Sequence, residues 1–178
     1  MTDDLMTRTD ARRVQAVASL NADSQARLGQ FFTPDRAAAL IAGLPRLPSS
    51  GRLRVLDPGA GAGSLTAALV DRLLAETPKL SLEVVAVEVD PDLSTFLSAT
   101  LADCRAAAAA AGSDVKTVIV HADFIELGTG HLGSDPILDE PFDLVIMNPR
   151  TRNWRLVLRT ANLSRVWPST ARICTPPS

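Results

Sequence analysis

The sequence contains no tyrosine, only two cysteines and no apolar run long enough to cross a membrane. Cys104 and Cys174 cannot build a disulfide framework or a cysteine-rich zinc site. The alanine-rich run at 106–111 is far shorter than the roughly 20 residues that span a bilayer. The chain starts with acidic and polar residues, so no signal peptide is visible. From these absences we expect a cytoplasmic protein that has no membrane partner.

Charge is divided unevenly along the chain, whose net charge is −2. Residues 150–178 hold six arginines, both tryptophans and no acidic residue, which gives +6. The preceding residues hold 12 basic and 20 acidic groups, which gives −8.

A length of 178 residues suits one α/β domain and is too short for two. The acidic body argues against simple charge-driven binding of nucleic acid, but it leaves open a nucleic-acid enzyme that lacks its basic part.

The order of the predicted elements is typical of a parallel sheet. Short runs rich in Val and Leu predict buried strands, and apolar spacing with Thr33-Pro34 or Asp90-Pro91 at the start predicts helices. Helices are predicted at 1–28, 34–44, 64–76 and 91–111, and strands at 52–56, 82–89, 115–120 and 142–147. This alternation predicts a parallel sheet covered on both faces, with ligand sites at the carboxyl ends of its strands.

Three successive strand ends carry groups that suit a nucleoside. The glycine loop 59–63 opens a helix directly after a strand, where backbone N–H groups can approach a ligand. Glu88 can accept both hydrogen bonds of a ribose diol, and Asp123 with Phe124 can read and cover an adenine ring. Taken singly, the glycine loop also fits a tight turn, Glu88 an exposed strand-end carboxylate, and Asp123 a helix or turn cap. Their coincidence at one sheet edge predicts a nucleoside site.

The start of the glycine loop distinguishes between a dinucleotide cofactor and S-adenosylmethionine. A dinucleotide fingerprint needs glycine at the sixth position, but Ser64 stands there and glycine falls one place earlier. The Asp57 carboxylate would repel a pyrophosphate, whereas it attracts the sulfonium and ammonium groups of S-adenosylmethionine. The loop therefore favours S-adenosyl-L-methionine as the cofactor.

The sequence from about residue 28 to 149 resembles the adenine-N6 DNA methyltransferases of restriction–modification systems. Gly29-Gln30-Phe31-Phe32-Thr33-Pro34 is similar to their N-terminal motif, which closes over the methionine end of the cofactor, and Asn148-Pro149 to the start of their catalytic Asn-Pro-Pro-Tyr motif. The resemblance implies a Rossmann-like class I S-adenosylmethionine-dependent methyltransferase fold, present here as its N-terminal part with about four parallel strands. It assigns cofactor contacts to Phe32, Thr33, Pro34, Asp57, Gly59, Gly61, Gly63, Glu88, Val89, Asp123 and Phe124.

The same resemblance implies the chemistry and the partners. In the family, the asparagine oxygen and the following proline carbonyl accept the two N–H groups of the target amine, which gives these roles to Asn148 and Pro149. The catalysis is orientation and electrostatics, with no metal. The implied partners are double-stranded DNA with a flipped adenine and a cognate restriction endonuclease. The alternatives are a methyltransferase for RNA or protein glutamine, because these share the motif, and a non-catalytic nucleotide-binding module.

The resemblance stops inside the catalytic motif, because Arg150-Thr151 stands where the family has Pro-Tyr. One nucleotide inserted in the Arg150 codon restores Pro-Tyr, and the same frame permits an Asn-Leu-Tyr segment across 171–178. We therefore divide the chain into an N-terminal helix and cofactor-closing motif (1–33), an incomplete catalytic core (34–149) and an out-of-frame basic tail (150–178). We expect such a chain to be inactive. The alternatives are a genuine phosphate-binding tail and a natural divergence of the motif.

Overall fold

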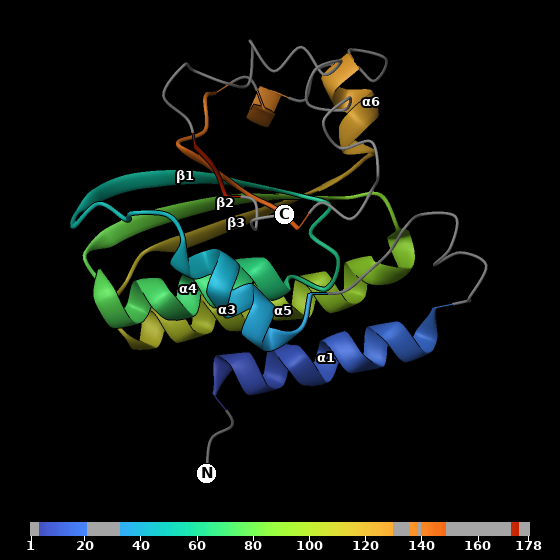
Figure 1. Cartoon of the computed structure of the whole chain (residues 1–178), viewed down its shortest axis with the longest axis horizontal. Coiled ribbons are helices and arrows are strands. Elements are labelled where there is room, and N and C mark those ends of the chain that lie inside the picture. The colour runs from blue at the N-terminus through green and yellow to red at the C-terminus, as the bar shows by residue number, and fades with distance from the viewer. Residues whose placement is uncertain (1–3, 21–32, 130–135, 139, 149–171, 175–178) are drawn as a thin grey trace.

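The computed structural model describes residues 4–20, 33–129, 136–138, 140–148 and 172–174. Their strands form one sheet in the order β3-β2-β1-β4-β5, and every pair of neighbours is parallel (Figure 1). The strands are β1 (Gly51–Pro58), β2 (Leu80–Glu88), β3 (Val115–His121), β4 (Leu144–Ile146) and β5 (Arg172–Cys174). The carboxyl ends of all five therefore lie at one edge.

Helices cover both faces of this sheet (Figure 1). One face carries α3 (Asp35–Gly43), α4 (Ser64–Glu76) and α5 (Pro91–Ala110), and the other carries α6 (Phe124–Thr129) and the short helix η1 (Pro136–Leu138). Helix α1 (Leu5–Ser19) forms an outer layer under α4 and α5, where Arg8 and Arg12 pair with Asp103 of α5 at 3.0 and 2.6 Å. None of the helices in the described residues is long and apolar enough to span a membrane.

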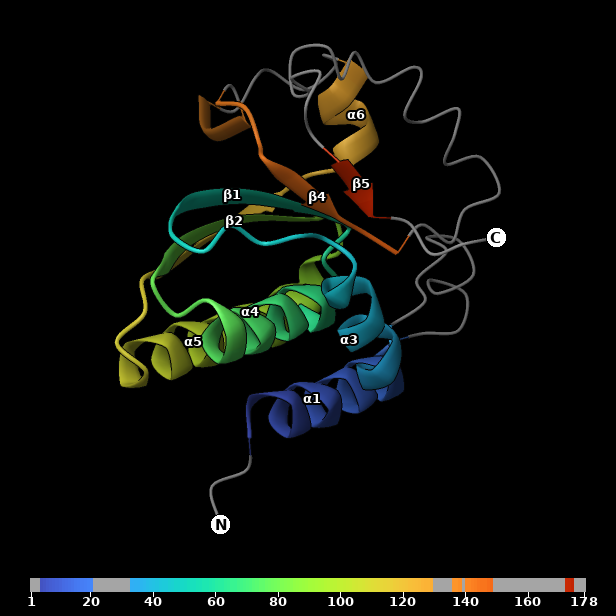
Figure 2. The same cartoon turned by 60° about the vertical axis from the view of Figure 1, so that its left-hand side comes forward.

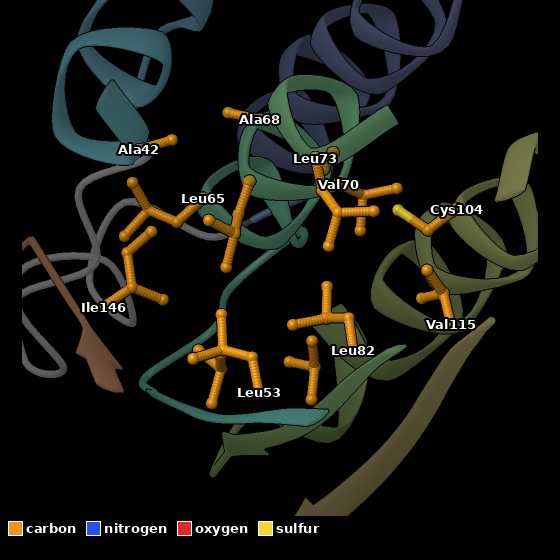
Figure 3. Close-up of a cluster of buried hydrophobic side chains, with 14 of the residues drawn as sticks. Ala42, Leu53, Leu65, Ala68, Val70, Leu73, Leu82, Cys104, Val115 and Ile146 are labelled. Atoms are coloured by element: carbon orange, nitrogen blue, oxygen red, sulfur yellow. The ribbon is translucent and has the colours of Figure 1, made fainter. Parts of the chain in front are cut away.

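The central strands are buried on both faces, as their continuous apolar sequences predict. Towards α4 and α5, Leu73, Leu82 and Cys104 belong to the largest core cluster (Figure 3). Towards α6, a second cluster is made of Leu56, Val85, Val87, Val120, Phe142 and Val145. The sheet is thus a rigid base for groups at its carboxyl edge.

A buried arginine in β1 holds the segment that leads into β4. The Arg54 side chain is 4% exposed, pairs with Glu83 at 3.0 Å and lies 4.3 Å from the centre of the Phe142 ring. It also donates to the backbone carbonyls of Ile137 and Glu140. The backbone N–H of Arg54 donates to Asp143 Oδ2 at 2.8 Å, and the Asp143 N–H donates back to the Arg54 carbonyl. These contacts fix where β4 begins, and hence where Asn148 lies.

The predicted parallel sheet with helices on both faces is present, and several of its elements begin or end at other residues than predicted. Strand β1 continues through Asp57 and Pro58, because these residues pair with Ala86 and Val87 of β2. Pro34 has an extended backbone and is the N-cap of α3, so the prediction that the helix begins at Pro34 with Thr33 as its cap was wrong. The predicted first helix begins at Leu5 and ends at Ser19, because Leu20 has an extended backbone; residues 1–3 and 21–28 of the prediction lie outside the described residues.

A fifth strand comes from the basic tail, where the sequence analysis predicted none. Strand β5 extends the sheet beyond β4, with Leu144 opposite Arg172 and Ile146 opposite Cys174 (Figure 2). Backbone pairing of this kind needs no particular side chains. The strand therefore leaves the reading frame of the tail untested.

Candidate cofactor and catalytic site

The predicted site residues gather at the carboxyl edge of the sheet because its strands are parallel. Asp57 lies near the end of β1, Glu88 ends β2, and Asp123 follows β3 by two residues. Asn148 follows β4, which pairs with β1. Phe32 and Pro149 lie outside the described residues. The edge therefore assembles groups from four strands that are far apart in the sequence.

The glycine loop is a turn held tightly against β2. The N–H groups of Gly59 and Ala60 both donate to the Val87 carbonyl, at 2.8 and 2.9 Å. The N–H of Gly61 donates to Glu88 Oε2 at 2.7 Å. The N–H groups that were expected to face a ligand thus have partners within the protein. The turn offers a shaped surface, and its contact with a ligand stays a prediction.

Gly63 is the N-cap of α4, and its backbone conformation and surroundings suit glycine alone. Its φ is +86°, and a Cβ there would lie 3.0 Å from Thr100 Cγ2 of α5. A side chain at this position would push α4 away from α5. Gly59 differs, because a Cβ built on it meets nothing within 4 Å among the described residues.

Glu88 is a buried carboxylate that organises the turn. It is 5% exposed, and its two oxygens accept the N–H groups of Gly61 and Asp90, at 2.7 and 2.9 Å. Burial raises the pKa of Glu88, and these hydrogen bonds oppose that rise. Each oxygen keeps a second lone pair, so the carboxylate can still accept ribose hydroxyls. Val89 beside it is 47% exposed, which leaves an apolar surface for a base.

Asp57 is the most deeply buried acid of the site, with 1% of its surface exposed. Thr66 Oγ1 of α4 donates to its Oδ2 at 2.7 Å, whereas Oδ1 is buried without a hydrogen-bond partner among the described residues. Burial raises the pKa of Asp57 to about 7, and the nearby charge of Glu88 adds to the rise. An orphaned carboxylate oxygen fits a cationic ligand. Sequence reasoning missed Thr66, whose only signal is a hydroxyl in the first turn of the helix after the glycine loop.

Asp123 and Phe124 have structural roles besides the predicted contact with adenine. Asp123 Oδ1 accepts the Glu126 N–H at 3.4 Å, which makes Asp123 a cap for α6. Phe124 is half-buried and packs on the apolar cluster under α6. Their part in reading adenine stays a prediction.

The N-terminal motif and the catalytic motif meet through one hydrogen bond. Asn148 Nδ2 donates to Thr33 Oγ1 at 3.0 Å, across 115 residues of sequence. Thr33 is 7% exposed and Asn148 is half-buried. Thr33 and Asn148 were predicted for separate tasks, and their contact was not predicted from the sequence.

A parallel sheet in this strand order, with a glycine turn after β1 and an acid ending β2, defines a class I methyltransferase fold. The rRNA methyltransferase AviRa from Streptomyces viridochromogenes shares it with a TM-score of 0.52 and 21% identity, over 82% of this chain and 74% of that one. A Plasmodium falciparum protein assigned as a protein-L-isoaspartate O-methyltransferase, in complex with S-adenosyl-L-homocysteine, has a TM-score of 0.50 and 14% identity, over 100% and 79%. No protein-family model matches the chain.

The sequence comparison is more specific than the structural one. The type II methyltransferase M.BsuBI of Bacillus subtilis is 34% identical over 131 residues, which are 71% of this chain and 25% of that protein. This match supports the restriction–modification methyltransferase family, in agreement with the family resemblance. It spans about a quarter of the length of this relative.

Proposed function

We propose that this chain carries the cofactor-binding and amine-accepting part of an adenine-N6 DNA methyltransferase from a restriction–modification system. The hydrogen bond of 3.0 Å between Asn148 and Thr33 is the observation that carries the proposal. It joins the two most specific motifs of the sequence at the sheet edge that also holds the glycine turn. A nucleotide-binding module without catalysis has no need for this link.

The site residues fit S-adenosylmethionine, which supplies an electrophilic methyl group on a sulfonium. The unpartnered Oδ1 of Asp57 suits the positive end of this molecule, and Glu88 suits its ribose. Val89 offers an apolar surface to the adenine ring, where Asp123 and Phe124 are the other candidates. The remaining residues proposed to contact the cofactor are Phe32, Thr33, Pro34, Gly59, Gly61 and Gly63.

Asn148 and Pro149 act on the target amine. The lone pair of an adenine exocyclic nitrogen is delocalised into the ring, which makes this nitrogen a poor nucleophile. Asn148 Oδ1 and the Pro149 carbonyl accept its two N–H groups, which favours a tetrahedral nitrogen with a free lone pair. That lone pair forms the bond to the methyl carbon, the carbon–sulfur bond breaks with its electrons left on sulfur, and one N–H proton then passes to water.

The proposed substrate is double-stranded DNA with its target adenine flipped out of the stack. The relative from Bacillus subtilis is a type II methyltransferase, and the N-terminal Phe-Phe-Thr-Pro segment is the sequence feature that favours DNA. A cognate restriction endonuclease is the proposed second partner. The target sequence is read by parts of such an enzyme that lie beyond these motifs.

We also propose that residues 150–178 are read out of frame and that the chain as it stands transfers no methyl groups. The catalytic motif breaks between Pro149 and Arg150, where acidic residues also disappear from the sequence. The motif then lacks the aromatic side chain that would stack on the flipped base. The nucleotide sequence around the Pro149 codon, read in all three frames, tests this proposal directly.

Two preparations test the function in separate steps. The 178-residue chain is titrated with S-adenosyl-L-homocysteine in a calorimeter, and we expect Glu88→Ala to weaken binding at least tenfold while the exposed Glu76→Ala does not. The gene with its frame restored is assayed for tritiated methyl transfer to DNA, RNA and a glutamine peptide, with Asn148→Ala as the inactive control. Transfer to RNA or peptide without transfer to DNA overturns the proposed substrate, and no cofactor binding by either preparation overturns the proposed cofactor.

A further inference from the structure

We propose that Thr66 is a positioning residue of the cofactor site, whose hydroxyl holds one oxygen of Asp57 and leaves the other to accept an N–H of the cofactor's ammonium group. The inference rests on the function proposed above and gives a task to a residue that the family resemblance does not assign. It starts from two observations on one carboxyl group. Its Oδ2 has a short hydrogen bond, and its Oδ1 has no partner among the described residues.

The hydrogen bond between Thr66 and Asp57 has one possible direction when the carboxyl group is ionised. A carboxylate only accepts hydrogen bonds, so the Thr66 hydroxyl must donate, with 2.7 Å between Oγ1 and Oδ2. Thr66 is 0% exposed and Asp57 is 1% exposed, so water competes weakly for the contact. The hydroxyl proton is therefore committed to one oxygen, and the plane of the carboxylate is held in place while the other oxygen can still accept.

The position of Asp57 in the sheet indicates the side from which a ligand would reach this oxygen. Strand β1 lies between β2 and β4. Side chains alternate along a strand, so Asp57 shares its face with Val55, which packs in the core cluster of α4. The sheet and α4 thus enclose Asp57 from several sides. Glu88 ends β2 at the carboxyl edge, and its charge acts on Asp57. The same edge holds the groups proposed for the rest of the cofactor.

The unpartnered oxygen distinguishes between the two positive groups of the cofactor. A buried acceptor without a donor costs free energy, and a donor that reaches it recovers this cost. An ammonium group carries three N–H donors, whereas a sulfonium has none. Asp57 Oδ1 therefore suits the ammonium group. A nucleoside that lacks this group gains nothing from Asp57.

This arrangement links ligand binding to pH. Burial raises the pKa of Asp57 to about 7, and the charge of Glu88 adds to the rise, whereas the hydrogen bond from Thr66 opposes it. An ammonium group needs the ionised carboxylate, so below about pH 7 a proton must leave Asp57 when the ligand binds. Among the described residues, Glu88 of β2 is the charged neighbour, whereas Thr66 of α4 and Asn148 after β4 carry no charge.

The test compares two ligands that differ at the amino-acid end. S-adenosyl-L-homocysteine carries the ammonium group, and 5′-methylthioadenosine keeps the adenine, the ribose and the thioether without it. The 178-residue chain is titrated with each ligand in a calorimeter at pH 6, 7 and 8, in two buffers of different protonation enthalpy, so that released protons are counted. Glu88 is proposed to contact the ribose, which both ligands have, so its own titration affects both alike.

The variants isolate one hydroxyl. Thr66→Val keeps the shape and removes the hydroxyl, and Thr66→Ser keeps the hydroxyl. Thr100→Val is the matched control, because Thr100 is also 0% exposed, contacts the Gly63 position from α5, and has a hydroxyl without a partner among the described residues. Thermal melting checks that each variant folds.

We expect Thr66→Val to lower the ratio of the S-adenosyl-L-homocysteine affinity to the 5′-methylthioadenosine affinity by at least about tenfold at pH 7. Thr66→Ser should restore this ratio, and Thr100→Val should leave it within about twofold of its original value. In the unchanged chain, S-adenosyl-L-homocysteine should release roughly one proton more than 5′-methylthioadenosine at pH 6 and almost none at pH 8. In Thr66→Val the same release should persist to higher pH, because the hydrogen bond that opposes the rise in the pKa of Asp57 is gone.

Each outcome supports or overturns the inference. An equal loss of affinity for both ligands in Thr66→Val would make Thr66 a structural support only and overturns it. Equal proton release by both ligands at pH 6 in the unchanged chain also overturns it, and this measurement decides even if Thr66→Val does not fold. If the 178-residue chain binds neither ligand, the frame-restored protein is titrated in the same way. Failure of both ligands there overturns the proposed cofactor as well, whereas binding with an unchanged ratio in Thr66→Val overturns this inference alone.

Discussion

Replacing Asp57 by asparagine should change how the stability of the chain depends on pH. The carboxyl group is 1% exposed and Thr66 donates to its Oδ2, an acceptor that the asparagine oxygen reproduces in the same shape. Burial raises the pKa of Asp57 from 3.8 to about 7 in the folded chain. The substitution therefore removes an ionisable group that folding disfavours and keeps its one hydrogen bond.

The direction follows from proton binding. Between about pH 4 and pH 7 the folded chain keeps the Asp57 proton while the unfolded chain loses it, so the free energy of unfolding falls as the pH rises. Above about pH 7 this decrease in the free energy of unfolding is complete. A shift of about 3 pKa units corresponds to about 4 kcal/mol, which is an upper limit for this contribution. Asp57→Asn has no ionisable group at this position, so its free energy of unfolding does not decrease in this way. The substitution also removes the negative neighbour of Glu88.

The assay is urea unfolding at a series of pH values from 4 to 8. We expect Asp57→Asn to match the unchanged chain near pH 4 and to exceed its unfolding free energy by about 2–4 kcal/mol at pH 8. Asp114→Asn is the matched control, because Ser81 donates to Asp114 at 2.7 Å on the exposed surface. A difference of the same size at pH 5 and pH 8, or a variant less stable at pH 8, would refute the reasoning.

Three further predictions concern positions whose surroundings are known. Gly63→Ala should lower the unfolding free energy by about 2–3 kcal/mol, because positive φ and the neighbouring helix leave no room for a methyl group, whereas Gly43→Ala in open space should not lower it. Arg54→Met should lower it by about 3–5 kcal/mol, because the Glu83 carboxylate and the Ile137 and Glu140 carbonyls lose a buried donor, whereas Arg52→Met at the exposed surface should leave it nearly unchanged. Urea unfolding at pH 7 measures all four, and equal losses within either pair would contradict the corresponding argument. Iodoacetamide at pH 8 should leave Cys104 unmodified until the chain is unfolded, because burial raises the pKa of this thiol to about 12. Peptide mass spectrometry measures this, and an alkylated Cys104 peptide from the native chain would contradict the prediction.

The glycine turn shows how far the sequence could predict the site. Gly59, Gly61 and Gly63 marked a turn between a strand and a helix, and the structure has a turn there with positive φ at all three. The sequence did not reveal that Glu88 holds the turn from 27 residues away through the Gly61 N–H. That contact depends on the register of β1 against β2, and spacing along the chain contains no information on register.

At the catalytic end of the site, the residues could be predicted from the sequence, but their contacts could not. Asn148 stood out because it follows a predicted strand and precedes proline. Its contact with Thr33 spans 115 residues, so it depends on where β4 and the start of α3 pack against β1 and α4. The anchor at Arg54 was equally hidden, because an arginine inside an apolar strand suggests only an edge position until its partners are known.

The two buried acids connect the stability of the fold with the chemistry of the ligand. Burial raises the pKa of both Asp57 and Glu88, and the charge of Glu88 further opposes ionisation of Asp57. Burial of these two acids costs free energy near neutral pH, where burial disfavours their ionised forms. Glu88 offsets part of its cost by accepting two backbone N–H groups that shape the turn. Asp57 has only Thr66, and its second oxygen lacks a partner in the described structure. A cation beside that oxygen would favour the ionised carboxylate. Binding of a positively charged cofactor would therefore also reduce the free-energy cost of burying Asp57.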